Sequence, residues 1–335
     1  MAQNSGAMAQ VFMVEKDGTS TPYNNLETAV EQALAGSTIY LPTGTFLITG
    51  SPTIAGTVRA NTLLINKQLR LIGAGADEGS LHATTIDGHI TLTTLASGST
   101  LEGFAMGNGR DLRIDNMSNL TVKRCKLRSF LFWSGGGNGN IFRECQLYHT
   151  YGCLTLYGSQ GYFPTNNIVT ELLVQNCVIG GGIHSVGYSF FTNNVITSSG
   201  TLTNVKNCTI SNNVFTLAGS LLNINTSSWN QISYNLCVGT VGTTNAGENN
   251  TIAYNIVNIP LNEIFVDQVR YHLLPSCPGV NAGSDGYDMG IYGSAVPAKE
   301  LRIPSNPQIT DFIVSGSSDI NGNLKVKIKV EAQTE

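Results

Sequence analysis

The stretch ELLVQNCVI, residues 171–179, decides the fold because its pattern recurs along the chain. It resembles a β-strand that holds Asn176 and Cys177 in its middle. A cysteine there could be a nucleophile, a metal ligand, half of a disulfide or a packing residue. With Cys177 as the reference position, apolar residues stand three positions before it and two positions after it. Apolar residues occupy these two positions in seven further segments as well, whose reference residues are Phe104, Cys125, Cys145, Asn194, Asn213, Asn235 and Asn255.

The reference residues recur at a period of about 20 residues, which predicts that each segment belongs to one coil of a β-solenoid. The longer step from Cys145 to Cys177 contains an insertion of about a dozen residues. Stacked coils place equivalent residues about 4.8 Å apart. An inward-facing Asn can then bond to its own turn and to the Asn of each neighbouring coil, and a buried Cys fits the same space.

We therefore predict an inward column of free thiols that continues as an asparagine ladder. The column comprises Cys125, Cys145 and Cys177, followed by Asn194, Asn213, Asn235 and Asn255. A disulfide between Cys125 and Cys145 stays open as an alternative, but their side chains would have to turn toward each other. No histidine shares the frame, which argues against a metal-binding or catalytic role. The chain has 7 cysteines, so at least one thiol has no partner within the chain.

This repeat resembles the right-handed parallel β-helix of the pectate-lyase-like superfamily, over roughly residues 35–293. The segment NNLETAVEQALAGSTIYLPTGTF, residues 24–46, is similar to the start of many secreted members. Its apolar residues predict a short helix that caps the first coil: Leu26, Ala29, Val30, Ala33 and Leu34. The segment LLPSCPGVNAGSDGYDMGIYG, residues 273–293, resembles the closing coil of bacterial extracellular members, with Asp285 and Asp288 as turn and cap residues.

These patterns divide the chain into four parts. Residues 1–10 are expected to be a vector-derived remnant, residues 11–36 a strand and the capping helix, and residues 37–302 an all-β parallel β-helix. Residues 303–335 are expected to form a two-stranded appendage, in which Leu324, Val326, Ile328 and Val330 alternate with lysines. Such an amphipathic pair needs a partner, either the flank of the solenoid or another molecule.

Composition narrows the partners and the location. The net charge is −4 and charged residues make up 12% of the chain, which gives no indication of a nucleic-acid or anionic-membrane partner. No apolar run reaches the roughly 18 residues of a membrane span, and no signal peptide opens the chain. We expect a secreted or cell-surface bacterial protein whose signal peptide has been removed.

The resemblance implies that any enzyme site lies in a groove on the outer face of the middle coils. Glycoside hydrolases need two carboxyl groups at a set separation, yet residues 145–247 contain only Glu171 and Lys206 as charged residues. We therefore expect neither a hydrolase nor a cofactor or metal. Four charged residues that flank the column should point outward, where we expect a solvated face with ion pairs between coils: Arg124, Lys126, Arg143 and Glu144.

Aromatic residues near the insertion give the candidate ligand surface, because aromatic faces pack well on sugar rings. Counted from the reference positions, Trp133, Tyr151 and His184 should be neighbours on adjacent coils. The candidate carbohydrate-binding residues are Trp133, Tyr148, Tyr151, Tyr157, Tyr162 and His184. Some of them could instead cover a small core of the inserted loop. Weak catalytic candidates are His149, Tyr151, His184 and Arg143.

Three functions stay open at this point. The first is binding, with or without processing, of a polysaccharide or cell-surface glycan. The second is a non-catalytic structural or adhesive role with self-assembly through the ends of the solenoid or the C-terminal strands. The third is a metal-independent polysaccharide lyase.

Overall fold

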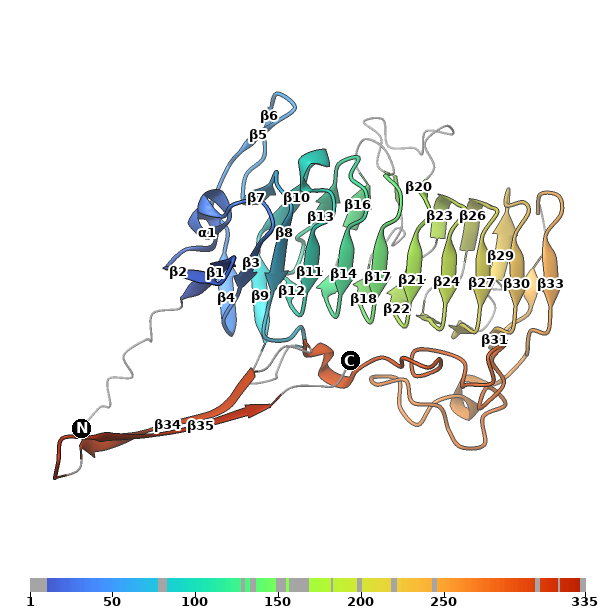
Figure 1. Ribbon diagram of the computed structural model, residues 1–335. Helices are drawn as coiled ribbons and strands as arrows, with labels where there is room; N and C mark the ends of the chain where they lie inside the picture. The colour runs from blue at the N-terminus through green and yellow to red at the C-terminus, as the bar shows by residue number, and fades with distance from the viewer. Residues whose placement is uncertain are drawn as a thin grey trace.

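A computed structural model describes residues 11–77, 83–127, 130–132, 137–148, 155–156, 169–181, 183–197, 201–217, 222–242, 246–304, 308–318 and 320–331. The chain forms the predicted all-β, right-handed parallel β-helix, with stacked coils along one axis (Figure 1). The α-helix of the described part, α1 (Leu26–Gln32), has 7 residues and is far too short to span a bilayer, which takes about 20.

Sheet 1 runs the whole length of the solenoid. Its strands, in spatial order, are β2 (Thr19–Tyr23), β1 (Phe12–Lys16), β3 (Ser37–Tyr40), β8 (Leu69–Ile72), β11 (Thr100–Glu102), β14 (Thr121–Lys123), β17 (Ile141–Arg143), β21 (Leu173–Gln175), β24 (Phe190–Thr192), β27 (Thr209–Ser211), β30 (Gln231–Ser233) and β33 (Thr251–Ala253). All pairs from β3 onward are parallel, whereas β1 and β2 are antiparallel.

Sheet 2 lies across a turn from sheet 1. It contains β4 (Gly44–Leu47), β9 (Thr84–Asp87), β12 (Ala105–Met106), β15 (Lys126–Leu127), β18 (Gln146–Tyr148), β22 (Val178–Gly180), β25 (Val195–Ile196), β28 (Val214–Phe215) and β31 (Leu236–Cys237).

Two shorter sheets complete the coils. Sheet 3 serves the first half: β7 (Thr62–Ile65), β10 (His89–Leu92), β13 (Leu112–Ile114), β16 (Phe130–Phe132) and β19 (Thr155–Leu156). Sheet 4 serves the second half: β20 (Val169–Thr170), β23 (Ile183–Gly187), β26 (Thr201–Lys206), β29 (Leu222–Asn225) and β32 (Val241–Gly242). A small hairpin joins β5 (Thr53–Ile54) to β6 (Thr57–Val58), and 3₁₀ turns span Thr94–Ala96, Leu261–Glu263 and Glu300–Arg302.

A left-handed residue makes the turn between sheet 1 and sheet 2. In eight coils the residue immediately before the reference position has φ between 54° and 70°. This bend separates two short strands and directs the reference side chain into the interior. We call these eight residues the turn column: Gly103, Arg124, Glu144, Asn176, Asn193, Asn212, Tyr234 and Tyr254.

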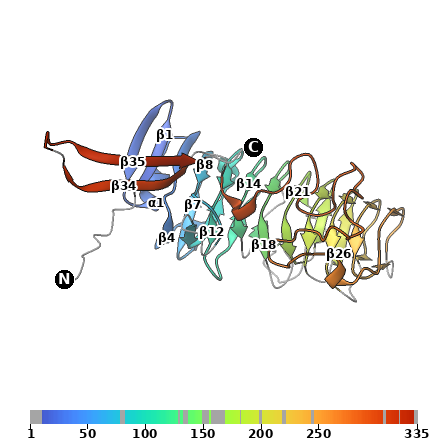
Figure 2. The same ribbon diagram turned by 90° about the horizontal axis from the view of Figure 1, so that it is seen from below.

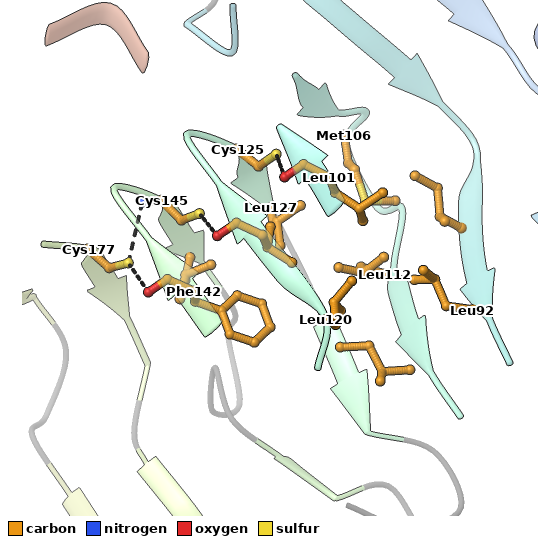
Figure 3. Packing of buried hydrophobic residues seen from close by; sticks show 14 of the residues in the cluster. Leu92, Leu101, Met106, Leu112, Leu120, Cys125, Leu127, Phe142, Cys145 and Cys177 are labelled. Carbon is orange, nitrogen blue, oxygen red and sulfur yellow. Dashed lines mark hydrogen bonds between the residues drawn. The ribbon is translucent and has the colours of Figure 1, made fainter. Parts of the chain in front are cut away.

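The predicted cysteine column and asparagine ladder are confirmed. Cys125, Cys145 and Cys177 are buried free thiols, so the alternative disulfide is absent (Figure 3). The Cys177 thiol donates to the Phe142 carbonyl at 3.5 Å and accepts the Cys145 N–H at 3.3 Å. Further along, Asn194 Nδ2 donates to Asn213 Oδ1 at 2.9 Å, and the same bond repeats from Asn213 to Asn235 and from Asn235 to Asn255.

A second polar column, which the sequence frame did not reveal, lies at the turn that enters sheet 1. Asn230 Nδ2 donates to Asn250 Oδ1 at 2.9 Å, and Asn230 Oδ1 accepts the Cys208 N–H at 2.9 Å. Asn140 and Ser189 accept a main-chain N–H from the preceding coil in the same manner. Several successive coils are therefore tied to each other at a second interior corner.

The helix α1 caps the first coil as predicted. Asn25 is its N-cap and accepts the Thr28 N–H at 2.9 Å. Leu26, Ala29, Val30 and Ala33 are buried. Leu34 is exposed, which corrects the expectation that it belongs to the apolar face, because the helix already ends at Gln32.

The C-terminal segment, residues 264–304, differs from the predicted closing coil. It returns along the outside of the solenoid toward the N-terminal coils (Figures 1 and 2). The outward residues Val178, Val195, Val214 and Leu236 of sheet 2 form a second hydrophobic core with residues of this segment: Ile264, Phe265, Cys277, Met289 and Ile291. Within the segment, Asp285 and Asp288 accept main-chain N–H groups, as turn residues do.

The appendage is an antiparallel hairpin of β34 (Gln308–Ser318) and β35 (Leu324–Glu331), with register shifts that mark irregular pairing. It projects away from the solenoid beside the N-terminal coils (Figure 2). This confirms a small C-terminal β appendage.

Candidate functional site

Much of the predicted ligand surface lies outside the described residues. Trp133, His149, Tyr151, Tyr157 and Tyr162 all fall there. The expected contact among Trp133, Tyr151 and His184 therefore stays a prediction.

The described candidates stand on three different sheets. His184 lies on β23 of sheet 4 beside Thr203, and burial lowers its pKa. Tyr148 lies on β18 of sheet 2 beside Gly180. It faces the C-terminal segment: the pKa of Tyr271 is raised mainly by burial and further by the nearby Tyr148. Tyr148 and His184 therefore lie on different sheets and on different faces of the solenoid.

Arg143 lies on β17 of sheet 1, between Lys123 and Gln175 of the neighbouring coils. The side chain is half-buried. It therefore belongs to the outer face of sheet 1, the sheet that also carries the exposed aromatic residues described next.

Exposed aromatic side chains stand on or directly before strands β24 and β30 of sheet 1, and we call Tyr188, Phe190 and Trp229 the aromatic surface. They are 62%, 52% and 59% exposed, respectively. Phe190 lies on β24 in register with Leu173, which is in register with Ile141 of β17. These two half-buried residues extend an apolar row that is about 10 Å long from Ile141 to Phe190.

Backbone geometry positions the other two aromatic residues. Tyr188 and Trp229 have φ of 50° and 63° and stand six residues before Asn194 and Asn235. Asn207 holds the same place in the coil between them, so the two rings are two coil steps apart, about 10 Å. This spacing of six residues was the missed signal, because the sequence frame compared only the reference position and its two apolar neighbours.

The charges around the aromatic surface are few. Glu171 precedes Tyr188 by one coil in the same turn position and is exposed. Arg143 lies two coils from Phe190 on sheet 1. Exposed Glu248 stands at the same turn four coil steps from Glu171, about 19 Å, which is too far for the carboxyl pair that glycoside hydrolysis requires. The arrangement offers flat apolar faces, the cations of Arg143 and exposed Lys206, and two widely separated carboxylates, which suits binding by stacking and hydrogen bonding.

A polar cavity of about 330 Å³ lies between sheet 2 and the C-terminal segment. Lys126, Glu144 and Gln146 line it from the solenoid, while Tyr292 and Arg302 line it from the segment. It occurs where the outward positions of sheet 2 change from valine and leucine to lysine and glutamine. The second hydrophobic core therefore ends there and a polar contact replaces it.

The charged residues of this region correct the prediction of a solvated face. Arg124 and Glu144 are only 1% and 3% exposed. Arg124 Nε lies 2.9 Å from Glu144 Oε2, while Arg124 Nη1 donates to the Ile303 carbonyl at 3.3 Å. The Lys299 N–H donates to Glu144 Oε2 at 2.9 Å. The predicted ion pair between coils exists, but the C-terminal segment buries it.

Each carboxylate that lines the cavity already has a partner. Arg302 lies 2.7 Å from Asp77, and His272 Nε2 lies 2.9 Å from Glu300 Oε1. The rings of His272 and Tyr292 stack at 3.9 Å. Burial, aided by the Glu300 carboxylate, raises the pKa of Tyr292 to about 12. The cavity is therefore a bonded interface that holds the segment to the solenoid.

No cluster of three or more metal-ligating side chains occurs in the part of the chain that the structure describes. No protein-family model matches the chain, and no curated protein is similar enough in sequence to count as a relative.

Proposed function

We propose that the protein is a secreted or cell-surface β-helix, of the pectate-lyase-like type, that binds a polysaccharide without cleaving it. The observation that carries this proposal is the aromatic surface on sheet 1. Exposed Tyr, Phe and Trp side chains on a rigid sheet lose little entropy on binding, and their faces match the C–H faces of pyranose rings. Half-buried Ile141 and Leu173 continue this surface toward Arg143.

The charges favour a neutral or weakly acidic glycan. Arg143 can donate two hydrogen bonds to a sugar carboxylate or hydroxyl pair. Glu171, at the other edge, would repel a densely anionic chain and can accept hydrogen bonds from sugar hydroxyls. The inserted loop between Cys145 and Cys177 contains Tyr151, Tyr157 and Tyr162, and Trp133 belongs to the preceding repeat. We propose that these four residues extend the same binding surface.

Affinity electrophoresis and calorimetry against a panel of neutral and acidic polysaccharides test the proposal. Trp229→Ala and Phe190→Ala should each weaken binding by at least about tenfold, because central aromatic contacts typically contribute about 2 kcal/mol. Tyr287→Ala is the matched control, since Tyr287 is an exposed aromatic residue on the C-terminal segment. Its binding should equal that of the wild type.

Product analysis separates binding from catalysis. Polysaccharide incubated with the protein should show no new reducing ends and no absorbance from unsaturated uronate. Unsaturated product would establish the lyase alternative, and saturated oligosaccharides would establish hydrolysis. Unchanged binding of both aromatic variants would remove the aromatic surface from the proposal.

A further inference from the structure

The two ends of the solenoid are built differently. At the N-terminal end, β1 and β2 reverse the strand direction and α1 covers the first coil. The edge strand β2 is mostly exposed and polar, and it contains Pro22, which has no N–H to offer another strand. This end is closed to a further strand.

At the other end, β33 is the last strand of sheet 1 and pairs only with β30 among the described strands (Figure 1). Its central residue, Ile252, holds an inward position yet is 38% exposed. The equivalent Ile210 and Ile232 are fully buried. The apolar interior of the solenoid therefore reaches solvent at β33.

The polar columns also stop there with unused donors. Asn213 and Asn235 each donate their main-chain N–H to the Asn side chain of the next coil. Among the described residues, nothing accepts the main-chain N–H of Asn250 or Asn255. In each earlier coil of the asparagine ladder, the following coil supplies the acceptor.

An aromatic stack ends at the same place. The rings of Tyr234 and Tyr254 stack at 5.0 Å on successive coils, and Tyr254 is 73% exposed. The outer face of the Tyr254 ring is therefore available for another ring. Together, β33, Ile252, Asn250, Asn255 and Tyr254 form what we call the open end.

We propose that the open end binds the open end of a second copy of this chain, giving a two-fold symmetric, tail-to-tail dimer in which the β33 strands pair antiparallel. Glu248 is the only charged residue in residues 229–258, so two identical open ends meet with little repulsion. A symmetric contact of this kind is closed and stops at two copies. The N-terminal end cannot replace the second copy, because Pro22 and the polar β2 edge offer no matching strand.

Sedimentation velocity of the full chain over a range of protein concentrations tests the proposal. We expect a monomer–dimer equilibrium that depends little on salt, because the contact contains almost no charge. Ile252→Lys and Ile252→Glu should each raise the dimer dissociation constant by at least about tenfold, since each places an unpaired charge at the inward position of the contact. Ser20→Lys, on the capped end, is the matched control and should leave the dimer unchanged.

Hydrogen exchange adds a readout at the residue concerned. The Ile252 amide should become more protected as the protein concentration rises, and circular dichroism should confirm that each variant is folded. A protein that stays monomeric at the highest concentration overturns the proposal. So does a dimer that the folded variants Ile252→Lys and Ile252→Glu leave intact, or a series of larger oligomers, which would require the N-terminal end as well.

Discussion

Asn213 offers the sharpest test of what stabilises the solenoid. Its Oδ1 accepts the Asn194 N–H and the Asn194 Nδ2, both at 2.9 Å. Its Nδ2 donates to the Phe191 carbonyl at 2.8 Å and to Asn235 Oδ1 at 2.9 Å. The residue is fully buried, so no water can replace these four bonds.

Asn213→Ala removes all four bonds. The Asn194 N–H loses its acceptor inside the core, which costs about 1–3 kcal/mol, and each of the other three broken bonds costs about 1 kcal/mol. Partial relaxation reduces the sum, so we expect the free energy of unfolding to fall by about 3–5 kcal/mol.

Asn213→Cys should cost roughly half as much, about 1–3 kcal/mol. The reason is already present in the column, where the Cys177 thiol accepts one main-chain N–H and donates to one carbonyl. A thiol at position 213 can make the same two bonds to Asn194 and Phe191. It cannot make the two bonds between side-chain amides.

Urea denaturation followed by circular dichroism and by fluorescence measures both values, provided that the two transitions coincide. Gln231→Ala is the matched control, because Gln231 is an exposed residue on β30; its effect should stay within about 0.5 kcal/mol. A loss below about 1 kcal/mol for Asn213→Ala, or an equal loss for Ala and Cys, would refute the assignment of stability to the ladder.

Four further outcomes are expected. Thiol reagents should leave the three column cysteines unmodified in the native protein and modify them after denaturation; rapid native labelling would contradict their burial. Burial raises the pKa of Cys237 from 9.0 to about 12, so the folded protein keeps a proton that the unfolded chain loses. Cys237 should therefore make the free energy of unfolding fall as the pH rises from about 9 to about 12. Denaturation curves of Cys237→Ala should show a smaller fall. Glu144→Ala should lower the free energy of unfolding by about 3–5 kcal/mol, because Arg124 stays buried without its main partner. Proteolysis and denaturation profiles like those of the wild type would show that the pair contributes little to stability. Trp133→Ala and Tyr151→Ala should each weaken glycan binding at least about tenfold with little change in melting temperature, and wild-type binding by both would exclude Trp133 and Tyr151 from the ligand surface.

The repeat and its interior could be predicted from the sequence because stacking forces the same residue type into the same place. Cys177 shares its position with Asn194 and Asn213, and each makes bonds that only a small, buried polar side chain can make. The second column escaped prediction because its residues are more varied. Ser189 and Asn230 perform the same task, yet no apolar frame around them distinguishes them from surface turns.

The C-terminal segment could not be placed from the repeat, although one signal was present. The position after the reference residue is apolar in the later coils, as in Val195 and Val214, but it is Lys126 in an earlier coil. An outward apolar row needs a cover, which is the second hydrophobic core. Burial of Arg124 and Glu144 was missed for the same reason, because charge alone favours solvent and only the returning segment reverses that preference.

The return of residues 264–304 has a consequence for the order of events during synthesis. A plain solenoid can add coils one after another as the ribosome releases them, since each coil contacts only its neighbours. Here Asn212, Asn176, Glu144 and Arg124 receive partners from Ser284, Ile291, Lys299 and Ile303, which are translated after the coils. The charged pair of the early coils is therefore only partly enclosed until residues 264–304 are synthesised and pack against these coils. Contacts that span 179 residues make this final docking the slowest step that the topology predicts.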